Sequence, residues 1–459
     1  MVSLTEEVVD FLLEAAPPPM EVRAKAIEHI IDGVAVMLAG SRTECASKLA
    51  GYVRGLGGIP ESMVIGFGFS TVARDAAMVN GASGHSDDYD DTQLSTAPDR
   101  IYGLMTHPTV PVLAAALAMG EAMDCSGREL LEAFITGFEV ECKLAEAIKP
   151  EHYRKGFHST GTLGTFGAWA ATGALMGLGE DELRYSLGVA ASLSSGIRAN
   201  FGTMTKPLHA GMAASNGVLA CRLGKQGFTS EREVLDGRWG FMEIMGGGAD
   251  PEFVVGRLGD PYALVDPGAT VKMYPCGSLG QPSMDAMLEI VTEGDLGPGD
   301  VREVRLKAGP NILEPLRYPE PADELQAKFS LQFGLASILL RRRAGLREYT
   351  MEWVNDPVLK ETMGKVRTIH DEEIAGMGVD RMRSVVEVEL MDGRVIRRVA
   401  DRARGTPEKP LKPSDLEQKF MECATFKLSE GEAQTVLNKI RRLEGLSGIG
   451  ELTILLSGE

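Results

Sequence analysis

The chain has 459 residues and a formal net charge of -18, and 44% of its residues are hydrophobic. A chain of this length exceeds one ordinary compact core, so we expect two domains, or one large domain that carries an insertion. The acidic balance, without a dense stripe of lysine and arginine, argues against a nucleic-acid partner.

The N-terminus and the cysteines indicate a cytoplasmic protein. The first residues are acidic and lack the basic and then apolar order of a signal peptide. The uncharged run 161–179 is rich in Gly, Ala and Thr, which predicts a buried helix rather than a membrane span. The six cysteines are scattered without metal-binding spacing, which is typical of a reducing compartment and predicts no structural zinc.

The first half of the chain predicts one helix after another. Apolar residues recur at helical spacing over residues 24–37, after the Pro17 to Pro19 breaker. The Ser-x-x-Glu order of a capping box predicts helix starts at Ser3, Ser126 and Ser230.

Two further segments have the composition of inner helices. Residues 161–177 and 210–220 alternate small residues with apolar ones, which lets helix backbones approach closely. Each begins just after a polar cluster, at residues 158–160 and 205–209. Helix N-termini offer unpaired N–H groups, so we expect both places to suit a carboxylate.

The pattern changes near residue 266. Strand-like runs at 301–306, 385–390 and 395–399 follow, the last two joined at Asp392-Gly393 as a predicted hairpin. Helical patterns return over 416–423 and 430–443. We therefore predict a mainly α protein, with a large all-helical domain over 1–266 plus 405–459 and a smaller α/β lid domain inserted over 267–404.

The densest polar signal is the run of four aspartates at Asp87, Asp88, Asp90 and Asp91. Alone it fits the Asp-Asp-x-x-Asp pattern with which helical isoprenoid synthases hold Mg²⁺ on a diphosphate. Such enzymes need a second acidic motif, and nothing later in this chain supplies one. A solvated acidic loop is the simpler alternative.

Histidines and lysines supply the other candidates. Four of the seven histidines lie in polar clusters beside Gly, Thr or Pro, and histidine has the pKa best matched to proton transfer near neutrality: His85, His107, His158 and His209. Lys206 and Lys272 each stand among uncharged residues, where a lysine either reaches the surface or holds an anion.

Six ordered motifs carry a resemblance to a known family. They are GHSDDYDDT at 84–92, HPTVPV at 107–112, GFHSTGT at 156–162, NFGTMTKPLHAG at 200–211, KMYPC at 272–276 and AKFSL at 327–331. Their order over nearly the whole chain resembles the MmgE/PrpD family, which contains 2-methylcitrate dehydratase, cis-aconitate decarboxylase and iminodisuccinate epimerase.

The resemblance implies a helical domain with an inserted α/β lid, a homodimer, and a carboxylate substrate handled without metal or organic cofactor. The family's active-site positions fall on residues that this sequence retains: Asp88, Thr92, His107, His158, Lys206 and Lys272. We expect His158 and His107 to be the acid and base, with Asp88 tuning one of them. Lys206, Lys272 and Thr92 would bind substrate carboxylates, together with His209 and Tyr274.

Three departures bear on the substrate. After Tyr274-Pro275, many relatives have a second Cys, an Arg and a His, whereas this chain has Gly277, Ser278 and Gln281. The loop 93–106 is longer than in the dehydratases, and Asp87 replaces a small or apolar residue. These departures favour a smaller or less anionic substrate than a tricarboxylate, which raises the epimerase alternative. We rank dehydration first, epimerisation second and decarboxylation third.

Overall fold

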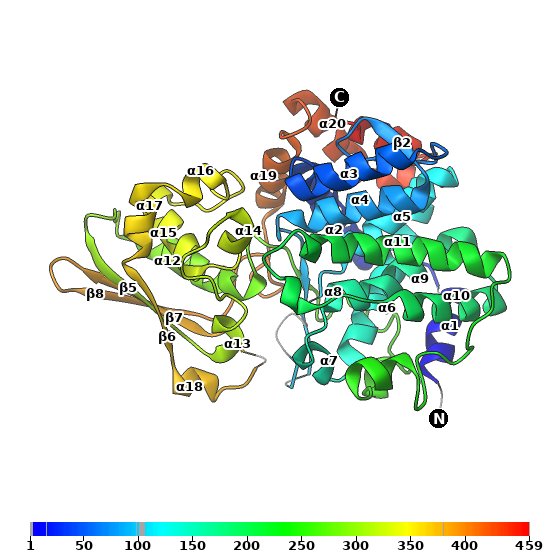
Figure 1. Cartoon of the computed structure of the whole chain (residues 1–459), viewed down its shortest axis with the longest axis horizontal. Coiled ribbons are helices and arrows are strands. Elements are labelled where there is room, and N and C mark those ends of the chain that lie inside the picture. Colours follow the sequence, from blue (N-terminus) through cyan, green and yellow to red (C-terminus); the bar gives the residue numbers. More distant parts are fainter. Residues whose placement is uncertain (1–2, 15, 98, 101–105, 380, 459) are drawn as a thin grey trace.

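The computed structural model describes residues 3–14, 16–97, 99–100, 106–379 and 381–458. The fold is mainly helical, as predicted, and it has two parts that lie side by side (Figure 1). One part is built from helices and contains both chain ends, and the other contains a twisted sheet with helices against it. Among the described residues, no helix is long and apolar enough to cross a membrane.

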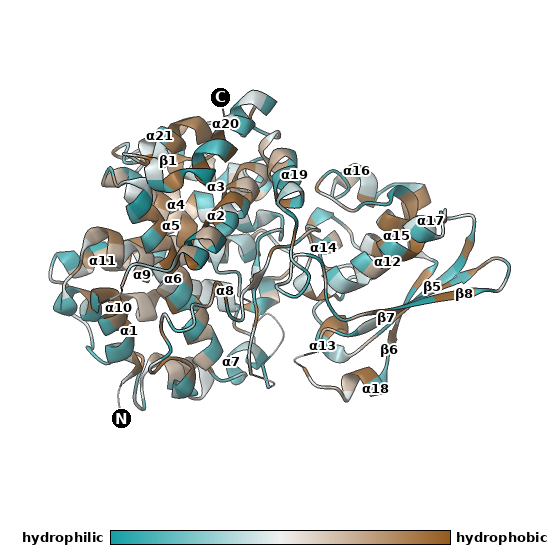
Figure 2. Cartoon of the chain, turned by 180° about the vertical axis from the view of Figure 1, so that it is seen from behind, coloured by the Kyte–Doolittle hydropathy of each residue, from teal (hydrophilic) through white to brown (hydrophobic). Residues whose placement is uncertain are grey.

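The helical part has a core rich in small residues, and brown, hydrophobic ribbon gathers around α4 and α5 near its centre in Figure 2. Helix α11 packs against α4, α5, α9 and α10, while α6 packs against α9 and α2 packs against α4 and α19. The helices of this part are α1 (Leu4–Glu14), α2 (Met20–Gly40), α3 (Glu44–Leu56), α4 (Ala73–Ser86), α5 (Thr109–Ala122), α6 (Gly127–Ala147), α7 (Glu151–Arg154), α8 (Ser159–Thr162), α9 (Gly164–Met176), α10 (Glu180–Leu193), α11 (Thr205–Lys225), α19 (Pro413–Ala424), α20 (Glu430–Arg441) and α21 (Gly450–Thr453).

The contact between α4 and α11 depends on two glycines. A Cβ atom at Gly81 would lie 2.9 Å from the Cα atom of Gly211, and a Cβ atom at Gly211 would lie 2.2 Å from the carbonyl oxygen of Met78. Only glycine fits at such a crossing, because any side chain would force the backbones apart.

The second part has a four-stranded sheet in the order β6-β5-β7-β8. Strand β5 runs parallel to β6 and antiparallel to β7, which forms a hairpin with β8. Helices α12 and α15 pack together and against the sheet. The elements are β5 (Val301–Ala308), β6 (Val366–His370), β7 (Ser384–Leu390), β8 (Val395–Ala400), α12 (Gln281–Glu293), α13 (Pro310–Leu313), α14 (Glu324–Ala327), α15 (Leu331–Arg341), α16 (Met351–Val354), α17 (Pro357–Met363) and α18 (Glu372–Ala375).

Short strands join the acidic segment to the crossing between the parts. Strand β3 (Thr92–Gln93) pairs antiparallel with β4 (Ala269–Thr270), so that Thr92 lies opposite Thr270. The N–H of Val271 then donates to the carbonyl of Gly405 at 3.1 Å, where the chain returns. This pairing holds Lys272 beside the acidic segment. A separate hairpin of β1 (Ser62–Val64) and β2 (Phe69–Thr71) lies before α4.

Most predicted elements are confirmed, including the hairpin at Asp392-Gly393, where Gly393 has a φ of 88°. The capping box at Ser126 is complete. The helix start at Ser230 is wrong, because the Ser230 hydroxyl donates to the carbonyl of Tyr185 and a series of turns follows. Helix α11 begins at Thr205, so Lys206 and His209 lie inside its first turns rather than before them.

Two predictions about the chain's organisation have different outcomes. All six cysteines are free thiols and all are buried. The domain boundaries at 266/267 and 404/405, and the action of the second part as a lid, stay predictions.

Candidate active site

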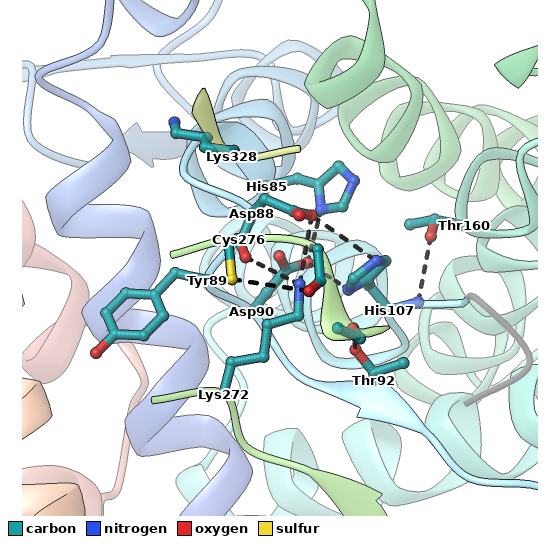
Figure 3. Close-up of polar contacts among 12 residues, drawn as sticks. His85, Asp88, Tyr89, Asp90, Thr92, His107, Thr160, Lys272, Cys276 and Lys328 are labelled. Carbon is teal, nitrogen blue, oxygen red and sulfur yellow. Dashed lines mark hydrogen bonds and ion pairs between the residues drawn. The ribbon is translucent and has the colours of Figure 1, made fainter. Parts of the chain in front are cut away.

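Residues from five parts of the chain meet at the acidic segment, and Figure 3 shows His85, Asp88, His107 and Lys272 among them. His85 lies in the last turn of α4, and the turn that follows contains Asp88 in a left-handed conformation with a φ of 51°. His107 precedes α5 and His158 is the N-cap of α8. Lys206 comes from the first turn of α11, and Lys272 comes from the segment that crosses to the sheet.

Asp88 lies between the two lysines. Lys206 Nζ donates to Asp88 Oδ1 at 2.6 Å, and Lys272 Nζ lies 3.3 Å from the same oxygen and donates to the Asp88 carbonyl at 2.9 Å. Lys272 is 0% exposed, Lys206 5% and Asp88 3%. Two buried ammonium groups therefore share the Asp88 carboxylate. The carboxyl group of Asp90, whose pKa burial raises, also acts on both lysines.

The two lysine charges explain why the Asp88 carboxyl group is ionised. Burial alone would raise the pKa of Asp88, but the Lys206 and Lys272 ammonium groups hold that pKa well below the usual carboxyl value. Burial also lowers the pKa of Lys206, because a dry environment disfavours its charge. Asp88 is thus an ionised carboxylate whose charge holds the lysines.

The histidines around this centre are neutral near pH 7. Burial lowers the pKa of His107 to about 3 and that of His209 to about 4, and it lowers the pKa of His158 well below its usual value. His107 Nδ1 bonds the carbonyl of Asp91 at 2.7 Å, and its Nε2 lies 4.0 Å from Asp88 Oδ1. An anion bound here would raise these pKa values again.

His158 and His209 form a pair. Their Nδ1 atoms lie 3.0 Å apart, so one imidazole donates and the other accepts. His158 Nε2 is buried and, among the described residues, has no hydrogen-bond partner. Asp88 Oδ2 and Asp90 Oδ1 are also buried without a partner in the described chain. Buried polar atoms are normally paired, so these three suit contacts to a bound molecule.

Two predicted substrate contacts have other partners. Thr92 Oγ1 lies 2.5 Å from Ser278 Oγ, which joins the acidic segment to the short helical turn before α12. The Tyr274 hydroxyl donates to Asp285 at 2.8 Å and accepts from Arg404 at 3.0 Å. The Tyr274 hydroxyl thus already has two protein partners, and its contact with a substrate carboxylate stays a prediction.

The positions that depart from the family pattern are structural. Gln281 accepts from the N–H groups of Met273 and Tyr274 at 3.2 Å and donates to the Tyr274 carbonyl at 2.7 Å. A Cβ atom at Gly277 would lie 2.6 Å from a methyl carbon of Leu316. Neither residue can carry a proton to a substrate.

Part of the long loop, residues 98 and 101–105, lies outside the described residues.

Asp87 turns away from the lysine pair. It is buried between Arg42 and Lys328, whose Nζ donates to Asp87 Oδ1 at 3.0 Å and to the Ser86 carbonyl at 2.8 Å. Burial alone would raise its pKa, but these two cations hold the pKa of Asp87 well below its usual value. Because Lys328 belongs to the second part of the molecule, this ion network joins the two parts.

Sequence reasoning named His85 as a candidate histidine and Asp90 as part of the acidic run, but it assigned neither a specific role, and it assigned none to Lys328. His85 Nδ1 bonds Asp90 Oδ2 at 2.8 Å, and its Nε2 lies 2.9 Å from Lys206 Nζ. Because His85 and Asp90 lie five residues apart in one motif, the sequence could have indicated their contact. The contact of His85 with Lys206 could not be predicted in this way, because it depends on the crossing of α4 and α11.

The Mg²⁺ interpretation can be tested against the same geometry. Donor atoms of four buried side chains lie within 4.8 Å of one another: His85, Asp88, Asp90 and His107. However, the Lys206 and Lys272 ammonium groups already neutralise Asp88 and would repel a divalent cation. The donor set therefore does not fit a magnesium cluster.

Comparisons with known proteins agree with the ordered motifs. The MmgE/PrpD N-terminal domain matches residues 4–254, and the MmgE/PrpD C-terminal domain matches residues 274–444. Cis-aconitate decarboxylase of Mus musculus is 29% identical over 440 residues, which cover 94% of this chain and 88% of that protein. The Homo sapiens protein of the same name is 29% identical, covering 83% and 79%. That of Aspergillus terreus is 25% identical, covering 96% and 92%.

Proposed function

Because this chain belongs to the MmgE/PrpD family, we propose that it is a lyase for a small carboxylate, with decarboxylation of a cis-aconitate-like tricarboxylate as its reaction. The observation that carries the proposal is the pair of buried lysines that share Asp88, with His107 and His158 beside them. This is the arrangement that negative charge on a substrate carboxylate needs.

The reaction requires the site to stabilise charge and to deliver one proton. In a β,γ-unsaturated acid, the bond from carbon to one carboxylate breaks and carbon dioxide leaves. The electron pair shifts the double bond, and the far alkene carbon takes a proton. Lys206 and Lys272 would hold the remaining carboxylates, and His158 or His107 would give the proton after substrate binding has raised its pKa.

Two observations support decarboxylation as the proposed reaction. The three relatives named above are cis-aconitate decarboxylases. Gln281, at a position where many family members have His, is committed to the backbone of residues 273–274, so the segment adds no second proton carrier. Dehydration, which needs both an acid and a base, is the second candidate, with His107 and His158 in those roles. Epimerisation is the third.

One experiment separates these reactions. The enzyme is incubated in heavy water with cis-aconitate, 2-methylcitrate, citrate and aspartate-derived dicarboxylates, and the products are followed by NMR. We expect carbon dioxide release with one deuterium in the product from cis-aconitate. A new alkene from a hydroxy acid would assign a dehydratase, and deuterium exchange without net change would assign an epimerase.

The isoprenoid synthase alternative predicts a different dependence. A magnesium enzyme loses turnover in EDTA, whereas catalysis by lysine and histidine side chains does not. We expect unchanged rates after dialysis against EDTA, and recovery of a lost activity by added Mg²⁺ would contradict the proposal.

A further inference from the structure

His85 is the centre of a buried hydrogen-bond chain that ends on Lys206. Its Nδ1 atom lies 2.8 Å from Asp90 Oδ2, and its Nε2 atom lies 2.9 Å from Lys206 Nζ. The His85 side chain is 0% exposed and that of Asp90 is 1% exposed. Both contacts are therefore buried within the protein.

The partners define the state of the imidazole. An ammonium group only donates, so His85 Nε2 must accept from Lys206. The single proton of the neutral ring then lies on Nδ1 and is donated to Asp90. Burial and the neighbouring Lys206 charge lower the pKa of His85 well below its usual value, which agrees with a neutral ring.

Within the described part of the chain, this arrangement leaves the Lys206 ammonium group with one N–H that is free to donate, and it sets the direction of that N–H. Of its three N–H bonds, one goes to Asp88 Oδ1 at 2.6 Å and one to His85. The aromatic rings of Phe201 and Phe329 flank the ammonium, with centroids 5.6 and 5.5 Å from Nζ. A lysine has a flexible four-carbon stem, and fixing two of its three donors sets the direction of the third.

We propose that His85, held by Asp90, is a positioning residue that aims the remaining Lys206 N–H at a substrate carboxylate. This inference rests on the proposed function for the identity of the ligand, but not for the Asp90–His85–Lys206 contacts. His85 exchanges no proton with the substrate. It acts through Lys206, as carboxylates act through metal-bound histidines.

The effect of replacing His85 on carboxylate binding should therefore depend on whether the new side chain can accept a hydrogen bond from Lys206. In His85→Leu the acceptor is lost, and we expect the Kd for tricarballylate, a saturated tricarboxylate with no leaving group, to rise about 10- to 100-fold. In His85→Gln the amide oxygen can accept from Lys206, and most of the affinity should return. His152→Gln is the control, because His152 is a buried histidine bonded to Thr162 and Met245. It should leave the Kd unchanged.

A second measurement needs neither ligand nor activity. In ¹⁵N NMR spectra of the whole chain, His85 should stay neutral with its proton on Nδ1 from pH 5 to pH 9, and its Nε2 resonance should move in Lys206→Met. Equal losses of affinity in His85→Leu and His85→Gln, or a charged His85 at pH 7, would overturn the inference. If the wild-type protein binds no tricarballylate, the proposed function fails, and the spectra still decide the role of His85.

Discussion

Asp88 shows how much of this site depends on single residues. A non-glycine residue in the left-handed region costs on the order of 1 kcal/mol and persists only where its surroundings hold it. Here two lysines bond its side chain or its carbonyl. The strained turn points the carboxylate at the lysines, while the next aspartates are bound elsewhere, Asp90 to His85 and Asp91 to His29.

At His158 we expect a catalytic effect without a structural one. His158→Gln keeps a similar volume but cannot transfer a proton, so kcat should fall about 10²- to 10⁴-fold while Tm stays close to that of the wild type. Steady-state kinetics with cis-aconitate and a thermal melt check this. The variant His152→Gln serves as the control, and a His158→Gln enzyme with full turnover would remove His158 from the mechanism.

The neutral histidines predict that anion binding takes up protons. Burial lowers the pKa of His107 to about 3 and that of His209 to about 4, so both are uncharged at pH 7. A bound polycarboxylate favours their charged forms and raises these pKa values. Affinity should therefore increase as pH falls from 8 to 6. Titration calorimetry in buffers of different ionisation enthalpy measures the uptake, and proton release on binding would contradict this prediction.

At the scale of elements, the crossing of α4 and α11 sets the distance between His85 and Lys206. Both residues lie near this crossing, which is close because Gly81 and Gly211 have no side chains. The helices are held by backbone contact rather than by flexible side chains. A small change at the crossing must therefore move the site.

Gly211→Ala tests this dependence. Its methyl group would overlap the Met78 carbonyl, and we expect a loss of about 1–3 kcal/mol in unfolding free energy. Displacement of Lys206 should lower kcat/KM by up to about 10²-fold. Gly51→Ala in α3 is the matched control, because its added methyl would meet no atom within 4 Å outside its own stretch of helix backbone. That control should gain about 0.5–1 kcal/mol with unchanged kinetics.

The ion network of Asp87 predicts a pH-dependent stability. Asp87→Asn leaves Lys328 without its carboxylate, at a cost of about 3–5 kcal/mol at pH 7. The folded pKa of Asp87 lies below the unfolded value, so its stabilisation is present above about pH 4 and is lost as pH falls toward the folded pKa. Urea unfolding at pH 7 and pH 3.5 should show a smaller difference at the lower pH. Asp10→Asn, at an exposed position of α1, should change the unfolding free energy little at either pH. An Asp87→Asn difference that is the same at both pH values would exclude the network.

At the scale of the whole molecule, the site needs both parts of the chain. Asp88 and Lys206 come from the helical part, Lys272 from the crossing segment and Lys328 from the second part. A hydrophobic cluster dominated by residues 274–400 also includes Leu94 and Phe201 of the helical part, so apolar packing continues across the junction. A ligand held by Lys206 and Lys272 would thus stabilise the junction of both parts.

We expect such a ligand to raise the Tm of the chain in one transition. Tricarballylate at 100 times its Kd should add about 2.7 kcal/mol of stability. Lys206→Met should abolish the shift, whereas Lys48→Met, an exposed lysine on α3, should keep it. Differential scanning calorimetry checks this, and a shift that persists in Lys206→Met would place the ligand elsewhere. The homodimer implied by the family stays a proposal, which light scattering after gel filtration tests.

The sequence by itself determined the helical character, the hairpin at Asp392-Gly393 and the polar motifs that carry the chemistry, because these depend on local periodicity and turn residues. It did not determine the parallel strand β6, whose partner β5 lies about 60 residues earlier. Tertiary structure alone decided which aspartate faces the lysines and why Asp87 does not. The physical reason is that residues 85, 206 and 272 meet through a close helix crossing, a left-handed turn and a two-residue strand pairing. No local pattern records where such contacts aim a side chain.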